Sequence, residues 1–135
     1  MTPPRYMLDT NIVSDLIRNP AGRAALYLRT IGDHGLVVSI ITAAELRFGA
    51  AKSGSPRLLS RIEAILDTLA VLPFDVPADA EYAIVSVELE ASGKPIGPND
   101  LLIAAHARSL GTTIVTANAT EFSHVRGLNV ENWLD

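Results

Sequence analysis

A strand and a helix meet at an acid in residues 5–17, RYMLDTNIVSDLI. The run RYML (5–8) is short and largely apolar and ends at Asp9, and Thr10 or Asn11 is suited to cap the helix that follows. The helix is indicated by apolar side chains at helical spacing, namely Ile12, Val13, Leu16 and Ile17. A strand that leads directly into a helix is the unit from which parallel α/β sheets are built.

Outward from this unit, short strands and helices alternate to the end of the chain. The pattern predicts further strands at residues 36–39, 71–74, 113–116 and 128–130. It predicts further helices at residues 24–31, 41–52, 57–69, 77–92 and 99–110. No repeat or long linker divides the chain, so we expect one domain over residues 1–135. The alternation predicts an α/β fold with a mainly parallel sheet.

Composition excludes several classes of function. The chain has 135 residues and no cysteine, which excludes a disulfide framework, a thiolate zinc site and an iron–sulfur cluster. Eleven basic and 15 acidic residues give a net charge of −4, so no bulk positive field attracts nucleic acid, although a polyanion can still bind locally. No signal peptide is visible, and no apolar stretch approaches the ~18 residues that span a bilayer. We expect a cytoplasmic protein that does not associate with membranes.

Four acids lie at or just beyond the ends of predicted strands. Asp9 directly follows the first strand, and Glu45 lies about one helical turn beyond the second. Asp100 falls in the first turn of an almost wholly apolar helix. Glu121 follows the strand at 113–116, with Asn118 between them. Because ligands of open α/β sheets bind outside the carboxyl ends of the strands, these acids are candidates for one shared site.

Each acid also has a simpler structural explanation. An acid at a helix start interacts favourably with the helix dipole, which suffices for Asp100, and Glu45 could face solvent beside Arg47. If the acids do converge, their charges repel strongly in a low-dielectric cleft, so that a carboxylate is protonated or a cation lies between them. Hard oxygen ligands without His or Cys favour Mg²⁺ or Mn²⁺ over zinc.

Five stretches of the chain together carry a family resemblance. They are MLDTN (7–11), SIITAAELRFGA (39–50), IGPNDLLIAAHA (96–107), IVTANATEF (114–122) and VRGLNVENW (125–133). In this order, and over nearly the whole chain, they resemble the PIN-domain ribonucleases, and most closely the VapC toxins of bacterial VapBC toxin–antitoxin pairs. The resemblance implies a three-layer α/β/α sandwich around a parallel sheet and Mg²⁺-dependent endonucleolytic cleavage of RNA, with Mn²⁺ as the alternative ion.

The resemblance also implies roles for individual residues. Asp9, Glu45 and Asp100 match the family's acidic triad and are the expected metal ligands. Glu121 is the expected fourth acid, at a position where many relatives carry Asp, and Asn118 is the alternative that completes the site. The expected supporting polar residues, which orient the acids or metal-bound water, are Thr10, Asn11, Ser39, Thr116 and Asn118.

The implied reaction is hydrolysis by metal-activated water, which leaves 5′-phosphate and 3′-hydroxyl ends. It needs no histidine base, so His34, His106 and His124 are expected outside the mechanism, with His106 as a buried core histidine. The implied substrate is structured RNA, with tRNA among the candidates. The implied partner is a VapB-type antitoxin in a higher hetero-oligomer. We also expect a homodimer, because the helical segments at 57–69 and 12–31 carry more apolar residues than the core is expected to hide.

Two other functions stay open at this point. A receiver or haloacid-dehalogenase-like phosphotransfer domain also places an Asp and Mg²⁺ at a strand end. That chemistry needs a lysine near the phosphate, and this chain has only Lys52 and Lys94, neither of which follows a late strand. The second alternative is a non-catalytic RNA- or partner-binding module on the same fold. Three separate acids argue against it, because they weaken the binding of an anion.

Overall fold

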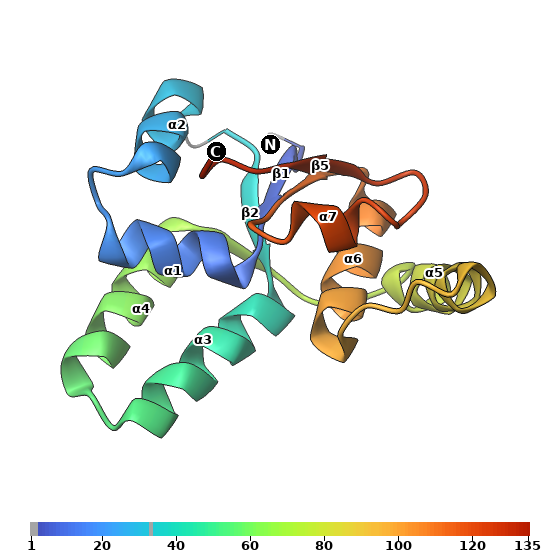
Figure 1. The fold of residues 1–135 in the computed structure, drawn as a ribbon. Coiled ribbons are helices and arrows are strands. Elements are labelled where there is room, and N and C mark those ends of the chain that lie inside the picture. The colour runs from blue at the N-terminus through green and yellow to red at the C-terminus, as the bar shows by residue number, and fades with distance from the viewer. Residues whose placement is uncertain (1–2, 33) are drawn as a thin grey trace.

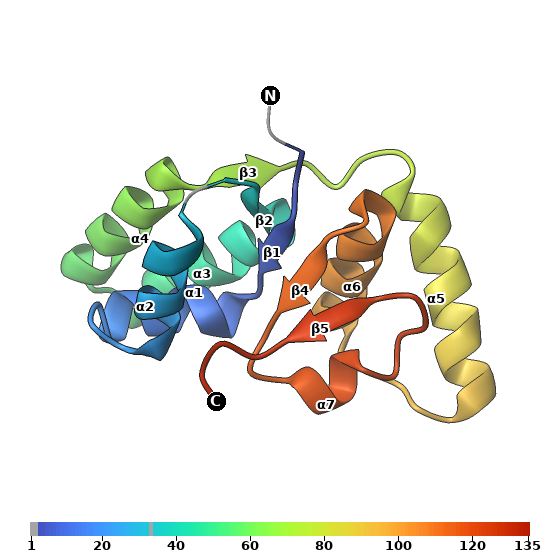
Figure 2. The ribbon, with the colours of Figure 1, turned by 90° about the horizontal axis from the view of Figure 1, so that it is seen from above.

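The core of the protein is a sheet in which every neighbouring pair of strands is parallel (Figure 2). The computed structural model describes residues 3–32 and 34–135, and its five strands lie in the order β3-β2-β1-β4-β5. The strands are β1 (Tyr6–Leu8), β2 (Leu36–Ser39), β3 (Ala70–Leu72), β4 (Thr113–Val115) and β5 (Asn129–Glu131). The first strand of the chain is therefore the central one. The predicted strands are confirmed to within two residues.

Helices connect the strands, as parallel pairing requires. Within the described residues they are α1 (Thr10–Arg18), α2 (Arg23–Ile31), α3 (Ile40–Ser53), α4 (Pro56–Thr68), α5 (Ala78–Ser92), α6 (Pro98–Leu110) and α7 (Ala119–Phe122). The sequence pattern did not indicate α7, because a single turn is too short to show a helical period. None of these helices in the described part of the chain combines the length and apolar character needed to cross a membrane.

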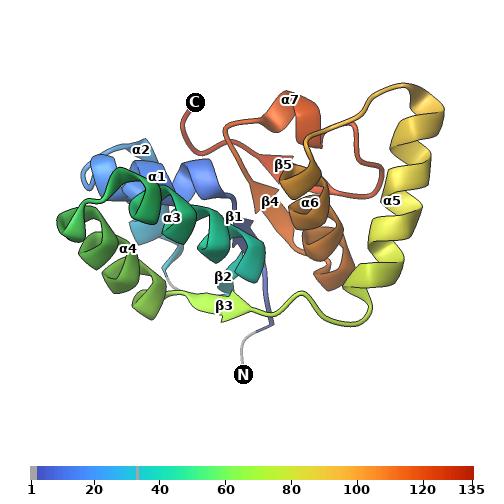
Figure 3. The ribbon, with the colours of Figure 1, turned by 90° about the horizontal axis from the view of Figure 1, so that it is seen from below.

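Alternate residues of the central strands feed two apolar clusters, one on each face of the sheet. One cluster contains Leu8, Val38 and Val115 and is covered by α1, α2, α3 and α4. The other contains Met7, Val37 and Ile114 and is covered by α5, α6 and the segment that includes α7. Figures 1 and 3 show these two groups of helices on either side of the strands. The expected three-layer α/β/α sandwich is confirmed.

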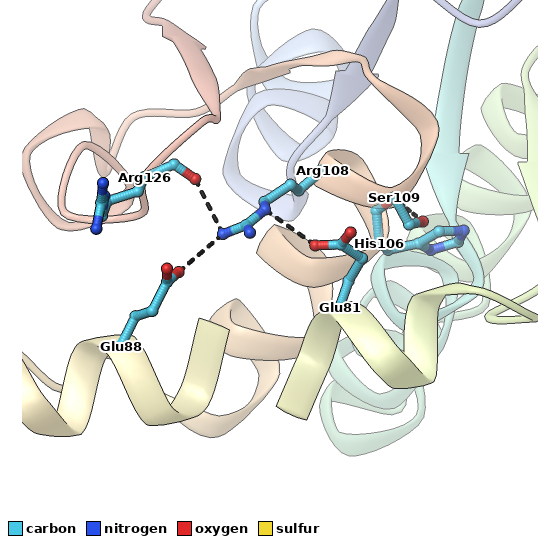
Figure 4. A network of polar contacts seen from close by, with 6 residues as sticks. All are labelled: Glu81, Glu88, His106, Arg108, Ser109 and Arg126. Atoms are coloured by element: carbon cyan, nitrogen blue, oxygen red, sulfur yellow. Dashed lines mark hydrogen bonds and ion pairs between the residues drawn. The ribbon is translucent and has the colours of Figure 1, made fainter. Parts of the chain in front are cut away.

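One arginine fastens the outer helix α5 to the rest of this second layer (Figure 4). On α6, Arg108 places its Nε 2.9 Å from Glu81 Oε2 and its Nη1 3.0 Å from Glu88 Oε1, and both acids belong to α5. The same Nη1 donates to the carbonyl of Arg126, between α7 and β5, at 3.0 Å. Arg108 thus ties α5, α6 and the C-terminal segment together on the side of α6 that faces away from α3.

Candidate active site

Asp9 lies at the junction of β1 and α1, at the carboxyl end of the central strand. Its Oδ1 accepts a hydrogen bond from the backbone N–H of Thr10 at 2.8 Å, which makes Asp9 itself the N-cap of α1. The prediction that Thr10 or Asn11 caps this helix is therefore wrong. The helix begins one or two residues earlier than the pattern suggested, and both side chains make contacts within the site instead.

Two residues distant from each other in sequence hold the second oxygen of Asp9. Its Oδ2 accepts from Thr116 Oγ1 at 2.8 Å and from Asn11 Nδ2 at 3.3 Å. Thr116 follows β4, which pairs directly with β1, so the sheet itself brings Thr116 to Asp9. Asn11 in turn accepts from the backbone N–H of Ala117 at 3.0 Å. The predicted residues Asn11 and Thr116 thus both contact the first acid.

Burial raises the pKa of Asp9 above its ordinary value, and the charge of Glu45 acts in the same direction. The hydrogen bonds from Thr116, Thr10 and Asn11 lower the pKa but do not outweigh the burial. Only 1% of Asp9 is exposed. A buried carboxylate that is held in place by hydrogen bonds, with no basic side chain among the causes of its pKa shift, is a favourable ligand for a cation.

Glu45 reaches the same edge of the sheet from α3. It accepts from Thr10 Oγ1, at the start of α1, and from Asn99 Nδ2 at 3.3 Å, at the start of α6. Sequence analysis missed Asn99. The available signal was its position. Asn99 directly precedes Asp100 in the first turn of the helix that begins after Gly97, so both residues lie at the same end of that helix.

The alternative in which Glu45 faces solvent beside Arg47 is wrong. Arg47 pairs instead with Glu63 of α4, at 2.8 Å, on an exposed surface. Residues two apart on a helix point in different directions, so Glu45 and Arg47 serve different neighbours.

Asp100 lies in the first turn of α6 and faces the other acids. Burial, followed by the charges of Asp9, Glu45 and Glu121, raises the pKa of Asp100 to about 6. A hydrogen bond from the Asn118 side chain acts in the opposite direction. Asp9, Glu45 and Glu121 therefore all lie close enough to Asp100 for their charges to raise its pKa.

Ser39 points toward a histidine rather than toward the acids. Its Oγ accepts from the backbone N–H of Ile41 at 3.1 Å and lies 2.8 Å from His106 Nδ1. Ser39 is fully buried and His106 is 2% exposed, which confirms His106 as a buried core histidine. Any effect of Ser39 on the acids is therefore indirect.

The donors at this edge fit a divalent cation that is bound through oxygen. Carboxylate and amide oxygens are the ligands that Mg²⁺ and Mn²⁺ prefer. Among the His, Asp and Glu residues that the structure describes, no three are drawn together into a finished metal site. The side chains are instead held by their protein neighbours, as Glu45 is by Thr10 and Asn99.

Two cavities open beside Thr10 and Glu45, one on each side of α3. The first, of about 270 Å³, lies between α1, α3 and α4 and has a largely apolar wall. That wall includes Ile17, Leu46, Leu58 and Ile62. The second, of about 560 Å³, extends toward Asn99 and the exposed ring of Phe48. A ligand in either cavity therefore contacts Thr10 and Glu45.

A parallel sheet in this order, with acids gathered at its carboxyl edge, defines a class of protein. The family model described as "PIN domain" matches residues 6–128, and the chain belongs to the PIN domain family. Its relatives within that family are VapC ribonucleases. Ribonuclease VapC2 of Haemophilus influenzae is 42% identical over 132 residues, which cover 96% of this chain and 98% of the relative. The tRNA(fMet)-specific endonuclease VapC of Shigella flexneri is 40% identical over 131 residues, with the same coverage.

Solved structures agree with this assignment. A chain of the crystal structure of DNA-bound VapBC from Salmonella typhimurium matches with a TM-score of 0.90 and 35% identity, over 96% of this chain and 98% of that chain. VapBC2 from Rickettsia felis, bound to a fragment of promoter DNA, gives a TM-score of 0.87 and 34% identity, over 95% and 98% of the two chains. The family resemblance drawn from the sequence motifs is confirmed.

Proposed function

We propose that the protein is a divalent-metal-dependent endoribonuclease and the toxin of a toxin–antitoxin pair. The observation that carries the proposal is the gathering of Asp9, Glu45, Asp100 and Glu121 from four separate segments at one edge of the sheet. Burial, followed by the charges of the neighbouring acids, raises the pKa values of Asp9 and Asp100, and a bound cation would offset both effects. A fold that needed these acids only for stability would keep them apart.

In this proposal Asp9, Glu45 and Asp100 hold Mg²⁺, with Mn²⁺ as the alternative, and Glu121 or Asn118 completes the site. The bound ion would supply a Lewis acid that activates water and stabilises the leaving oxygen. The chain's own contribution is orientation. Thr116 and Asn11 fix Asp9, and contacts from two other helices direct the carboxylate of Glu45.

His106 takes no part in the proposed reaction. The ring of His106 is buried, and its Nδ1 is engaged by Ser39, so it cannot exchange protons with a substrate at the surface. Water rather than the RNA 2′-hydroxyl is the expected nucleophile, and the products carry 5′-phosphate and 3′-hydroxyl ends.

For the substrate we propose structured RNA, with tRNA as the first candidate, because a relative at 40% identity is described as a tRNA(fMet)-specific endonuclease. A non-catalytic RNA-binding module is the alternative. Gathered carboxylates disfavour it, since they repel the phosphates that supply most of the affinity for nucleic acid. Cleavage of cellular RNA is consistent with the proposed cytoplasmic location.

A VapB-type antitoxin is the proposed partner, since the structural relatives are VapBC complexes. The larger hetero-oligomer and the homodimer remain proposals. Exposed apolar side chains lie in the two predicted interface segments, with Leu26 53%, Tyr27 47% and Leu59 44% exposed, and also on α5, where Val87 is 67% exposed. Sedimentation of the isolated protein at micromolar concentration tests the dimer, and a species of about 14 kDa would exclude it.

The activity is tested with purified protein and tRNA in Mg²⁺, in Mn²⁺ and in EDTA. Cleavage is expected with either ion and not in EDTA, and the products should accept a ligation that requires a 5′-phosphate. Products with 2′,3′-cyclic phosphates would mean that the 2′-hydroxyl is the nucleophile and would contradict the proposal. RNA binding without cleavage in either ion would favour the non-catalytic alternative.

A further inference from the structure

Helices α3 and α6 are joined by polar contacts at two points. At the first, Ser39, the N-cap of α3, contacts His106 of α6. At the second, Asn99 of α6 donates to Glu45 of α3. The contacts occur in opposite order along the two helices, six residues apart on α3 and seven apart on α6. At 1.5 Å per residue, the joints are separated by about 9 Å along one helix and about 10 Å along the other.

The Ser39–His106 joint is buried and its protons can be assigned. Ser39 Oγ accepts from the Ile41 backbone N–H and lies 2.8 Å from His106 Nδ1, so its hydroxyl proton is available for donation to Nδ1. The backbone of Pro73 lies near the ring and acts to raise the pKa of His106. Because proline has only a carbonyl to offer, the other ring nitrogen, Nε2, carries the proton. Burial lowers the pKa of His106, which keeps the ring in this neutral form.

The imidazole ring is held by three elements of the fold. Pro73 and Phe74 follow β3, and the Phe74 ring packs edge to face on His106 at 5.4 Å. Ser39 supplies the end of β2 and the start of α3, and His106 itself belongs to α6. In Figure 4 the ring of His106 and the guanidinium of Arg108 point in opposite directions from α6. The two residues therefore fix α6 on opposite sides.

We propose that His106 and Ser39 are positioning residues whose hydrogen bond sets α3 and α6 in the register that brings Glu45 to Asn99 and Asp100. The inference rests on the proposed function, in which Glu45 and Asp100 serve the same ion. Neither His106 nor Ser39 touches the reacting groups. Apolar side chains at these two places would also pack the helices together. They would not define one register, since apolar burial is non-directional whereas a hydrogen bond has a narrow geometry.

Three substitutions separate positioning from simple stability. His106→Phe keeps a ring of similar size but removes the acceptor, and Ser39→Ala removes the donor. His106→Asn leaves a cavity but can still accept from Ser39 near the position of Nδ1. We expect His106→Phe and Ser39→Ala to lower kcat for RNA cleavage about 10- to 100-fold with little change in KM, the usual scale for residues that orient metal ligands. We expect His106→Asn to melt at a lower temperature yet keep most of kcat.

The chain offers a matched control for the lost N-cap. Ser55 caps α4 as Ser39 caps α3, and its Oγ accepts from the Leu58 backbone N–H at the same 3.1 Å. Ser55→Ala removes the same N-cap hydrogen bond without the buried contact to a histidine, so it should lower the melting temperature by the contribution of the cap and leave kcat unchanged. The double variant Ser39→Ala with His106→Phe should lose no more kcat than either single variant, because the same contact is removed each time.

A second measurement does not depend on activity. The side-chain amide of Asn99 donates to Glu45, so its NMR signals report whether the two helices keep their register. They should shift in His106→Phe and Ser39→Ala and stay in place in Ser55→Ala. A wild-type protein that cleaves no RNA would count against the proposed function, while these shifts would still support the positioning role.

The proposal is overturned if folded His106→Phe keeps the wild-type kcat and the wild-type Asn99 signals. It is also overturned if kcat follows the melting temperature across all the variants, including His106→Asn and Ser55→Ala, since His106 would then serve stability alone.

Discussion

The Oδ2 atom of Asp9 lies 2.8 Å from Thr116 Oγ1, although the two residues are 107 positions apart in the chain. Their strands are neighbours: β1 and β4 pair in parallel, with Leu8 opposite Val115. Each residue follows its strand directly, so strand pairing alone sets them side by side. The position of the principal acid is therefore determined by the centre of the sheet rather than by a mobile loop.

Asp9→Asn should abolish RNA cleavage while the protein stays folded. The amide keeps the shape of the carboxylate and can still meet Thr10, but it removes one negative ligand, and we expect at least about a 100-fold loss of activity. Expression of the wild-type chain in a bacterium should arrest growth, and this variant should relieve the arrest. Circular dichroism checks that the fold is retained.

A matched control, Asp15, lies six residues further along the chain, on α1. Asp15 is also buried, but it accepts a hydrogen bond from the side chain of Asn19 and lies outside the acidic edge. Asp15→Asn should therefore cost stability without loss of cleavage. Unaltered toxicity of a well-expressed Asp9→Asn protein would contradict the metal-nuclease mechanism.

Thr116→Val should impair the site through Asp9. Valine has the shape of threonine but donates no hydrogen bond to Asp9 and accepts none from the Asn118 backbone N–H, which lies 2.9 Å from Thr116 Oγ1. We expect about a 10- to 100-fold loss of metal affinity or activity and a destabilisation of about 1–3 kcal/mol. Since this hydrogen bond lowers the pKa of Asp9, the acid limb of the pH–activity profile should also move to higher pH. Thr116→Ser keeps the hydroxyl group and should restore the activity and the position of the acid limb. A serine variant as impaired as Thr116→Val would show that the methyl group of Thr116 matters instead of the hydroxyl.

Asp100 gives the metal-free protein a distinctive dependence of stability on pH. Its pKa is about 6 in the folded protein, above the ordinary value of 3.8. A raised pKa means that the folded state binds the proton more tightly. The stabilising contribution of Asp100 is therefore complete below pH 3.8 and is lost as the pH rises through about 6. In EDTA, the melting temperature of the wild type relative to Asp100→Asn should fall between about pH 4 and about pH 6.5 and change little at higher pH.

Mg²⁺ should reverse this trend, because the ion binds the ionised carboxylates. The rise in melting temperature on adding Mg²⁺ should be larger at about pH 7.5 than at about pH 5. The same rise at both pH values would mean that Mg²⁺ acts away from Asp100.

An antitoxin segment should inhibit the site by replacing its cation. Arginine or lysine can pair with carboxylates, and arginine can pair with two oxygens at once. We expect the C-terminal segment of a VapB-type antitoxin to direct such a residue toward Asp9, Glu45 and Asp100, with its apolar residues in the cavity beside Leu46 and Leu58. Replacing that residue by alanine should weaken neutralisation more than total binding. High Mg²⁺ should restore cleavage before the partners separate, whereas equal metal content in the free and inhibited protein would indicate simple occlusion of RNA.

Local sequence signals were sufficient for most of the fold. The strand at Leu36–Ser39 has the predicted bounds, because a β-branched run leads directly into a helix there. The four acids could be proposed together because each lies near a strand end or a helix start, and these positions meet at one sheet edge.

The contacts around the acids could not be read in the same way. The bond from Asn99 to Glu45 depends on how two helices pack, and no spacing along the chain encodes it. The same holds for Ser39, whose partner His106 lies 67 residues away. The N-cap role of Asp9 was missed because Asp, Thr and Asn follow one another, and all three are good caps.

The central place of β1 in the sheet also has a consequence during synthesis. The ribosome makes β1 first, but the strand that brings Thr116 to Asp9 is added more than a hundred residues later, which takes about 5 to 20 seconds at the usual rates of translation. Until then the nascent chain lacks Thr116 and Glu121, which both follow β4. A product released early by premature termination before β4 therefore carries Asp9 without the neighbour that orients it. The acidic edge is therefore assembled only after β4 has been synthesised.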